Sequence, residues 1–148
     1  MMINMVKRLF HTGTSAELLD LVILVTRISV GIFMITHGLP KLNRLLAGGE
    51  IQFGDPIGLG PAASLALVVF AEFFCSIFIA IGLGTRLASV PLIITMAVAS
   101  FVSHGEDPFS SKEKALLYLL IYIFLLVVGS RKYSLDHLLF GRQSPNKG

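Results

Sequence analysis

The chain has 148 residues, of which 54% are hydrophobic and only 14% charged, and its mean hydropathy is +0.80. This composition is typical of a membrane protein and departs from the average of soluble domains. The formal charge of +3 comes from Lys and Arg in short segments between apolar stretches, so it excludes a continuous basic face for nucleic acid. Cys75 is the only cysteine, which excludes an internal disulfide, a paired-cysteine redox motif and a cysteine-rich metal site.

The first apolar stretch, residues 16–39, is long enough to cross a bilayer, because a hydrocarbon core of about 30 Å needs roughly 20 helical residues. Thr14 and Glu17 at its start have the spacing of a capping box. Pro40 predicts an end or a kink at the other side. No small-x-small cleavage site follows the stretch, so we expect an uncleaved first span rather than a signal peptide.

Three further apolar stretches predict an all-α fold, an antiparallel bundle of four transmembrane helices in one domain, with later spans at residues 61–83, 86–103 and 111–130. Pro61 suits a first helical turn, and Gly82 and Gly84 suit a helix C-terminus. The connection after them is so short that the second and third spans must form a hairpin. Ser110 and Glu113 repeat the capping-box spacing before the last span.

The distribution of Lys and Arg indicates how the bundle is oriented. With both termini cytoplasmic, seven of these residues lie inside and four outside, as the positive-inside rule favours. The only long connection, residues 43–60, contains five glycines and covers the outer face as a lid or binding loop, or is a plain connector. Segments 2–11 and 135–140 mix apolar and basic residues, so they lie in the inner membrane interface or fray into the cytoplasm.

Arg27 and Glu72 are charged residues well inside the first two spans. Arg27 lies ten residues from His37, and Glu72 lies eleven from Pro61, which places them about 15 and 16 Å from the predicted outer helix ends. An unpaired charge at the bilayer centre costs about 2.5 to 3.5 kcal/mol, so we expect an Arg27–Glu72 ion pair. Such a pair either fixes only the packing of two helices or lines a polar site, and Ser76 is a second possible partner of Glu72.

A second polar group is predicted at the outer helix ends, made of His37, Lys41, His104, Glu113, Lys114 and Tyr118. Histidines titrate near neutral pH, so beside a tyrosine and a carboxylate they could bind a polar head group or pass protons. Interfacial anchoring and helix capping also explain these residues one by one. Haem ligation by His37 and His104 is disfavoured because both lie at helix ends. The predicted binding residues are Arg27, His37, Lys41, Glu72, His104 and Tyr118, without a metal site.

These residues in this order resemble the DoxX-like membrane proteins. The resemblance covers about residues 20–135 and rests on Arg27, Gly31, His37, Gly38, Lys41, Glu72, the turn from Gly82 to Ala88, His104 and Tyr118. It implies a four-helix bundle in a bacterial cytoplasmic membrane. The family includes a small subunit of a thiosulfate:quinone oxidoreductase and members tied to redox or quinone stress, so a quinone is the cofactor that the resemblance implies by analogy.

The leading hypothesis is a membrane component of an oxidoreductase system that binds a quinone-like or small polar substrate within the bundle. The sequence contains no recognisable redox cofactor site, so a partner protein would have to supply the electrons. A non-catalytic membrane scaffold or assembly subunit is the alternative. A small-solute transporter fits less well because four spans show no inverted repeat, although a homo-oligomer would double their number.

Overall fold

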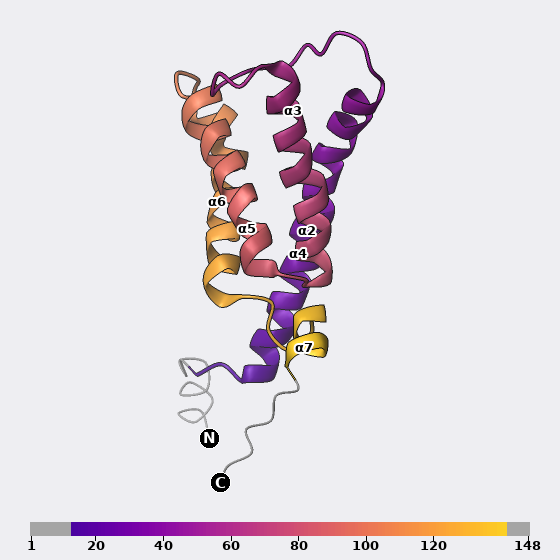
Figure 1. Cartoon of the computed structure of the whole chain (residues 1–148). Helices are drawn as coiled ribbons and strands as arrows, with labels where there is room; N and C mark the ends of the chain where they lie inside the picture. Colours follow the sequence, from indigo (N-terminus) through magenta and orange to yellow (C-terminus); the bar gives the residue numbers. More distant parts are fainter. Residues whose placement is uncertain (1–12, 142–148) are drawn as a thin grey trace.

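A computed structural model describes residues 13–141, in which all regular structure is helical (Figure 1). The first described helix, α2 (Ala16–Leu46), has 31 residues. Its N-cap is Ser15, whose hydroxyl accepts a hydrogen bond from the Leu18 amide, so the predicted cap at Thr14 is wrong. The helix continues through Pro40 and ends seven residues beyond the predicted boundary at Leu39. A proline inside a helix removes one backbone hydrogen bond, a loss that membrane helices tolerate.

A single rod of 21 residues follows the loop, made of α3 (Pro61–Val69), the π-helical segment η1 (Phe70–Cys75) and α4 (Ser76–Ile81). Pro61 occupies its first turn as predicted. The rod ends at Gly82, which adopts a left-handed conformation with φ 73°, and Gly84 does the same with φ 57°. These two glycines reverse the chain, so the predicted hairpin is found.

The second half of the hairpin is α5 (Thr85–Val98), extended by the π-helical segment η2 (Ala99–Ser103). After a short turn, α6 (Phe109–Val128) runs back, and α7 (Leu135–Phe140) is a short helix beside the hairpin turn. Pro108 precedes α6, and no side chain caps this helix. The predicted capping box is therefore wrong, because Ser110 and Glu113 lie inside the first turns of α6.

The helices pack as two pairs side by side (Figure 1). α2 lies along α3, η1 and α4, while α5 lies along α6 and also touches η1 and α4. α2 touches the rod closely at Gly31 and Gly38, where a Cβ would come within 2.8 Å of the Ser76 carbonyl oxygen and 2.7 Å of the Glu72 carbonyl carbon. In contrast, α2 meets α6, and α3 meets α5, at few points. Two seams of the bundle are therefore less tightly closed.

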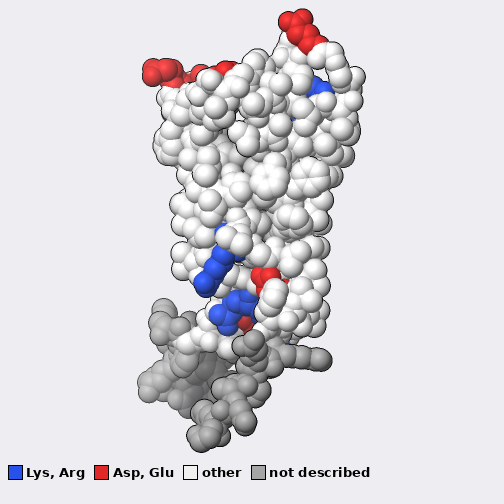
Figure 2. All heavy atoms as spheres, viewed as in Figure 1, with Lys and Arg blue, Asp and Glu red and all other residues white. Residues whose placement is uncertain are grey.

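Three of the described helices are long and apolar enough to cross a membrane, namely Ala16–Leu46, Pro61–Ile81 and Thr85–Ser103. α6 also has 20 residues, but it carries Lys112, Glu113 and Lys114 near its start. Figure 2 shows charged side chains toward the two ends of the molecule and a wide uncharged band between them. Many large apolar side chains are exposed, as expected for helices that face lipid.

The two ends of the bundle are named here by what lies there. The loop end carries residues 47–60 together with the end of α2 and the start of α3, and the α7 end carries the hairpin turn at Gly82–Gly84 and α7 (Figure 1). Between them lies a core of buried apolar side chains that includes Ile23, Met34, Ile79, Leu92 and Leu125.

Candidate functional site

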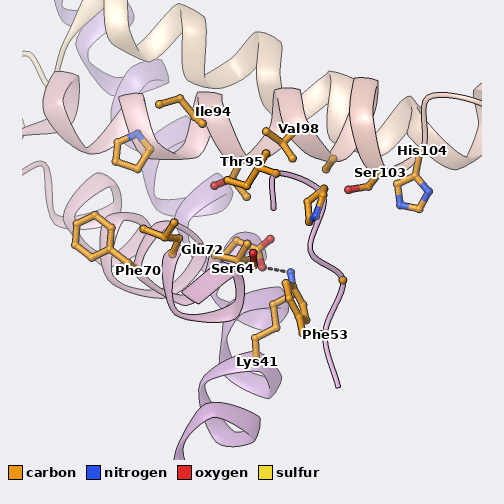
Figure 3. A pocket seen from close by; sticks show the side chains of 17 residues that line it. Lys41, Phe53, Ser64, Phe70, Glu72, Ile94, Thr95, Val98, Ser103 and His104 are labelled. Carbon is orange, nitrogen blue, oxygen red and sulfur yellow. Dashed lines mark hydrogen bonds and ion pairs between the residues drawn. The ribbon is translucent and has the colours of Figure 1, made fainter. Parts of the chain in front are cut away.

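An ion pair between Lys41 and Glu72 is the centre of the candidate site (Figure 3). Lys41 Nζ lies 2.5 Å from Glu72 Oε2, and the Glu72 residue is only 4% exposed. Gly38 brings the α2 backbone against Glu72, and Lys41, about one turn further along α2, then reaches the carboxylate. The opposite charge of Lys41 compensates a carboxylate that would otherwise be costly to bury.

The predicted Arg27–Glu72 ion pair is wrong, because α2 is longer than expected. With its end at Leu46, Arg27 lies nineteen residues, or about 28 Å, from the loop end, whereas Glu72 lies about 16 Å from Pro61. The two charged residues are therefore at different depths. Lys41, which was assigned to the outer surface, takes the place of Arg27 as the partner of Glu72.

Arg27 itself is fully buried at the α7 end. Its guanidinium donates to the Ile79 carbonyl at 3.5 Å and to the Tyr133 carbonyl. It fills the space over Gly82, where a Cβ would come within 1.9 Å of Arg27 Nη1. Because Ile79 lies in the last turn of α4, Arg27 satisfies a helix-end carbonyl and interacts favourably with the negative end of the helix dipole. Arg27 thus joins α2, α4 and the segment before α7, and lies outside the cavities described below.

A cavity of about 540 Å³ opens beside the ion pair, in the seam between α3 and α5. Most of its lining is apolar, and its polar side chains are those of Lys41, Glu72, Ser64, Thr95, Ser103 and His104 (Figure 3). The α5 wall of the cavity is formed by Pro91, Ile94, Thr95 and Val98. A mostly apolar space with an ion pair in its lining has the chemistry expected for a site that binds an amphipathic small molecule.

The glycine-rich loop forms one wall of this cavity through Phe53, Gly54, Pro56 and Ile57. Asp55 holds the loop in place, since its carboxylate accepts hydrogen bonds from the Leu59 and Gly60 amides and the Ser64 hydroxyl, at 2.8 to 2.9 Å. The Gly60 amide and the Ser64 hydroxyl are the main reasons why the pKa of Asp55 is lowered. The loop is therefore a structured cover over the cavity.

A second cavity of about 300 Å³ lies on the other side of the ion pair and shares Lys41, Glu72, Ala99 and His104 with the first. It also contains His37, Lys114 and Tyr118, with the His37 and Tyr118 rings edge to face at 6.2 Å between centroids. Tyr118 stacks in turn on the buried Tyr122. Five of the six predicted binding residues, all except Arg27, therefore line two adjoining cavities.

Other residues of the predicted polar groups have different surroundings. Glu113 lines neither cavity, and the buried Ser76 hydroxyl makes no hydrogen bond with Glu72. His104 Nδ1 lies 2.7 Å from Asp107 Oδ2, an exposed pair that holds the imidazole ring at the cavity edge. Within residues 13–141, no three His, Cys, Asp or Glu side chains converge as metal ligands.

Both π-helical segments lie at the site, which the sequence analysis did not predict. η1 carries Glu72 and Phe70, and η2 carries Ala99 and Ser103 immediately before His104. A π-turn widens a helix by one residue, and such turns are frequent at functional sites. Apolar periodicity does not reveal them, because both segments continue the apolar stretches of their helices without a break in helical structure.

Three acidic residues outside the predicted set also have structural roles. Asp20, in the first span, pairs with Arg131 at 2.5 Å. Asp136 accepts hydrogen bonds from the Gly84 amide and the Ser130 hydroxyl, and so holds α7 against the hairpin turn. Asp55 orders the loop, as described above. The position of Asp20 in an apolar stretch could have indicated that this carboxylate needs a partner. Nothing in the sequence around Asp55 or Asp136 indicates their structural roles.

Comparison with known proteins identifies the family. The family model named DoxX matches residues 22–105, more than half of the chain. An uncharacterized protein of Haemophilus influenzae is 32% identical over 124 residues, which cover 77% of this chain and 87% of that protein. No solved structure matches the chain. With its long apolar helices, this chain is therefore a membrane protein that belongs to the DoxX family.

Proposed function

We propose that this protein is the membrane component of an oxidoreductase system and binds a quinone-like molecule in the cavity between α3 and α5. The observation that carries the proposal is the chemistry of that cavity, a mostly apolar space of about 540 Å³ with the Lys41–Glu72 ion pair in its lining. A quinone has the matching form, a polar ring attached to an apolar chain. The chain would lie along Ile94 and Val98, and the ring would reach the ion pair.

The polar groups suit the chemistry of a quinone. Reduction to the quinol takes up two electrons and two protons, and an external partner protein supplies the electrons in this proposal. The Lys41 ammonium can donate a hydrogen bond to a quinone carbonyl, while the Glu72 carboxylate can accept one from a quinol hydroxyl. His104, exposed at the cavity edge, is placed to exchange protons between the cavity and water.

The proposal places the protein in a bacterial inner membrane with four spans. α6 is then the fourth span, with Lys112 and Lys114 reaching toward the interface at the loop end. Both termini are cytoplasmic in this proposal, because that orientation assigns seven of the Lys and Arg residues in the flanking segments to the inner side and four to the outer side. In a Cys75→Ser background, a membrane-impermeant maleimide should label Glu50→Cys in intact cells and Lys132→Cys only after lysis. The reverse pattern would refute this orientation.

Quinone titration of the purified protein in lipid nanodiscs tests the binding proposal. We expect saturable quenching of protein fluorescence by a short-chain ubiquinone or menaquinone analogue. Glu72→Gln should weaken binding about tenfold, the effect of losing one charge-assisted hydrogen bond. Glu113→Gln is the matched control, because this carboxylate lies at the same end but lines neither cavity. Equal affinity of the two variants, or no saturable binding to the wild-type protein, would contradict the proposal.

A non-catalytic scaffold or assembly subunit is the second candidate function. The observation that favours it is α7, whose Leu138, Leu139 and Phe140 side chains are more than 60% exposed next to the hairpin turn. An exposed apolar patch of this kind suits a membrane interface or a partner protein. If Leu139→Ser leaves quinone binding unchanged but abolishes co-purification of a partner, the scaffold role gains support.

A further inference from the structure

A third cavity lies in the other open seam of the bundle, between α2 and α6. It is a groove of about 320 Å³ lined by Thr26, Ser29, Val30 and Phe33 from α2 and by Lys114, Leu117, Tyr118 and Ile121 from α6. From Lys114 to Ile121 the groove follows about 10 Å of the α6 axis. Apart from Lys114, no charged side chain lines it. Because this seam faces the membrane, an acyl chain is the natural filling for it.

The groove leads directly to the polar cavity at the ion pair. Lys114 and Tyr118 line both spaces, so the groove and the cavity of about 300 Å³ meet at these two side chains. The α3/α5 cavity reaches the same polar cavity from the opposite seam, through Lys41, Glu72 and His104. The polar cavity thus has an apolar space on each side, and these spaces lie in different seams of the bundle.

The charges at this junction favour an anion. Glu72 is the only carboxylate that lines the polar cavity, and Lys41 already neutralises it. Lys114 remains as a cation that lines both the groove and the polar cavity, and Ser110 and Ser111 line the polar cavity with it. All three residues lie in the first turns of the 20-residue α6, where the helix dipole also favours negative charge. Glu113, their neighbour in sequence, lines neither space.

We propose that the α2/α6 groove and the adjoining polar cavity bind an anionic phospholipid. Its phosphate lies at Lys114 and the hydroxyls of Ser110 and Ser111, and one acyl chain runs down the groove past Ser29 and Ile121. The bound lipid closes the seam that the protein leaves open and covers Tyr118 and His37 from the membrane. This proposal can be tested apart from quinone binding, because the residues that contact the phosphate and the acyl chain, Lys114, Ser110, Ser111, Ser29 and Ile121, do not line the α3/α5 cavity.

Thermal unfolding of lipid-depleted protein in detergent tests the proposal, with phosphatidylglycerol or phosphatidylcholine added to the micelles. We expect phosphatidylglycerol to raise the unfolding temperature more than phosphatidylcholine does. Lys114→Gln should weaken this response about tenfold in lipid concentration, as loss of one charge-assisted contact predicts. Lys112→Gln is the matched control, because Lys112 donates to the Gly105 carbonyl and lines neither space, so its response should equal that of the wild type.

A second variant tests the acyl chain separately from the phosphate. Ser29→Phe fills the groove and should reduce the number of phosphatidylglycerol molecules retained in native mass spectrometry, whereas Leu120→Phe, on the lipid-facing side of α6, should not. Equal stabilisation by the two lipids, equal loss in the Lys112 and Lys114 variants, or full stabilisation by inorganic phosphate alone would overturn the proposal. A failure of quinone titration would leave these results unaffected, so the two proposals can fail independently.

Discussion

At the α7 end of the bundle Arg27 is enclosed by backbone carbonyl groups, whereas at the loop end Lys41 and Glu72 form an ion pair that two cavities share. Both ends therefore bury charged side chains in a membrane protein. The two Arg27 Nη atoms donate hydrogen bonds to backbone carbonyl groups of the fold, while the ion pair lies at the boundary of two cavities. This difference teaches that burial of a charge in a membrane helix does not by itself indicate a binding site.

The largest effect on stability should come from removing the hydrogen bonds of Arg27 at the α7 end. Arg27→Met leaves the Ile79 and Tyr133 carbonyls without their partner in a closed part of the fold, so we expect a loss of about 3 to 5 kcal/mol in the free energy of unfolding. Denaturant unfolding in detergent measures this loss. Arg27→Lys should recover little of it, because an ammonium cannot reproduce the geometry of the guanidinium fork. A variant as stable as the wild type would show that the α7 end is not held by Arg27.

Removal of Glu72 should have the next largest effect. Glu72→Leu leaves Lys41 without its counter-charge, and we expect a loss of about 2 to 4 kcal/mol. Lys41→Met in the same chain should restore most of this stability, while quinone binding stays impaired. Arg27→Met combined with Glu72→Leu should instead be additive within about 0.5 kcal/mol, because the two side chains share no partner. Strong energetic coupling between the Arg27 and Glu72 substitutions would contradict the conclusion that the two ends of the bundle are held by separate interactions.

The contact between α7 and the hairpin turn should contribute less. Asp136→Asn keeps the side-chain shape but weakens the hydrogen bonds from the Gly84 amide and the Ser130 hydroxyl, so we expect a loss of about 1 to 2 kcal/mol. Hydrogen exchange at residues 84–88 should accelerate, and exchange at the loop end should remain unchanged. Faster exchange at both ends would show that the two regions unfold together.

The smallest effect concerns the loop and depends on pH. The folded pKa of Asp55 is lower than the usual value of about 3.9, so its contribution to loop order is fully present at neutral pH. This contribution should decline as the pH falls below about 4 toward the folded pKa. Protease cleavage within residues 47–60 should therefore increase on acidification. Asp55→Asn should be cleaved readily at neutral pH, with little further increase at lower pH. If cleavage of this variant depended on pH as it does in the wild type, the hydrogen bonds of Asp55 would not be what orders the loop.

Some of the candidate site could be predicted from the sequence. His37, Lys41, His104 and Tyr118 were placed together because antiparallel helices bring alternate ends of consecutive spans to one side of a bundle. Glu72 was singled out because a carboxylate in an apolar run needs a partner. The identity of that partner could not be predicted, because it depended on where α2 ends. Pro40 suggested an earlier end, and the resulting shift moved Arg27 to the other half of the bundle.

The sequence by itself determined the long apolar helices and the hairpin at Gly82 and Gly84, because these follow from apolar length and from residues that lack a side chain. Only the tertiary structure decided which charges meet, where the π-helical segments form and which seams stay open. The physical reason is that pairing and cavity shape depend on the relative shift of neighbouring helices. The sequence of a single helix does not determine its shift relative to a neighbour, which is set only when the helices pack together.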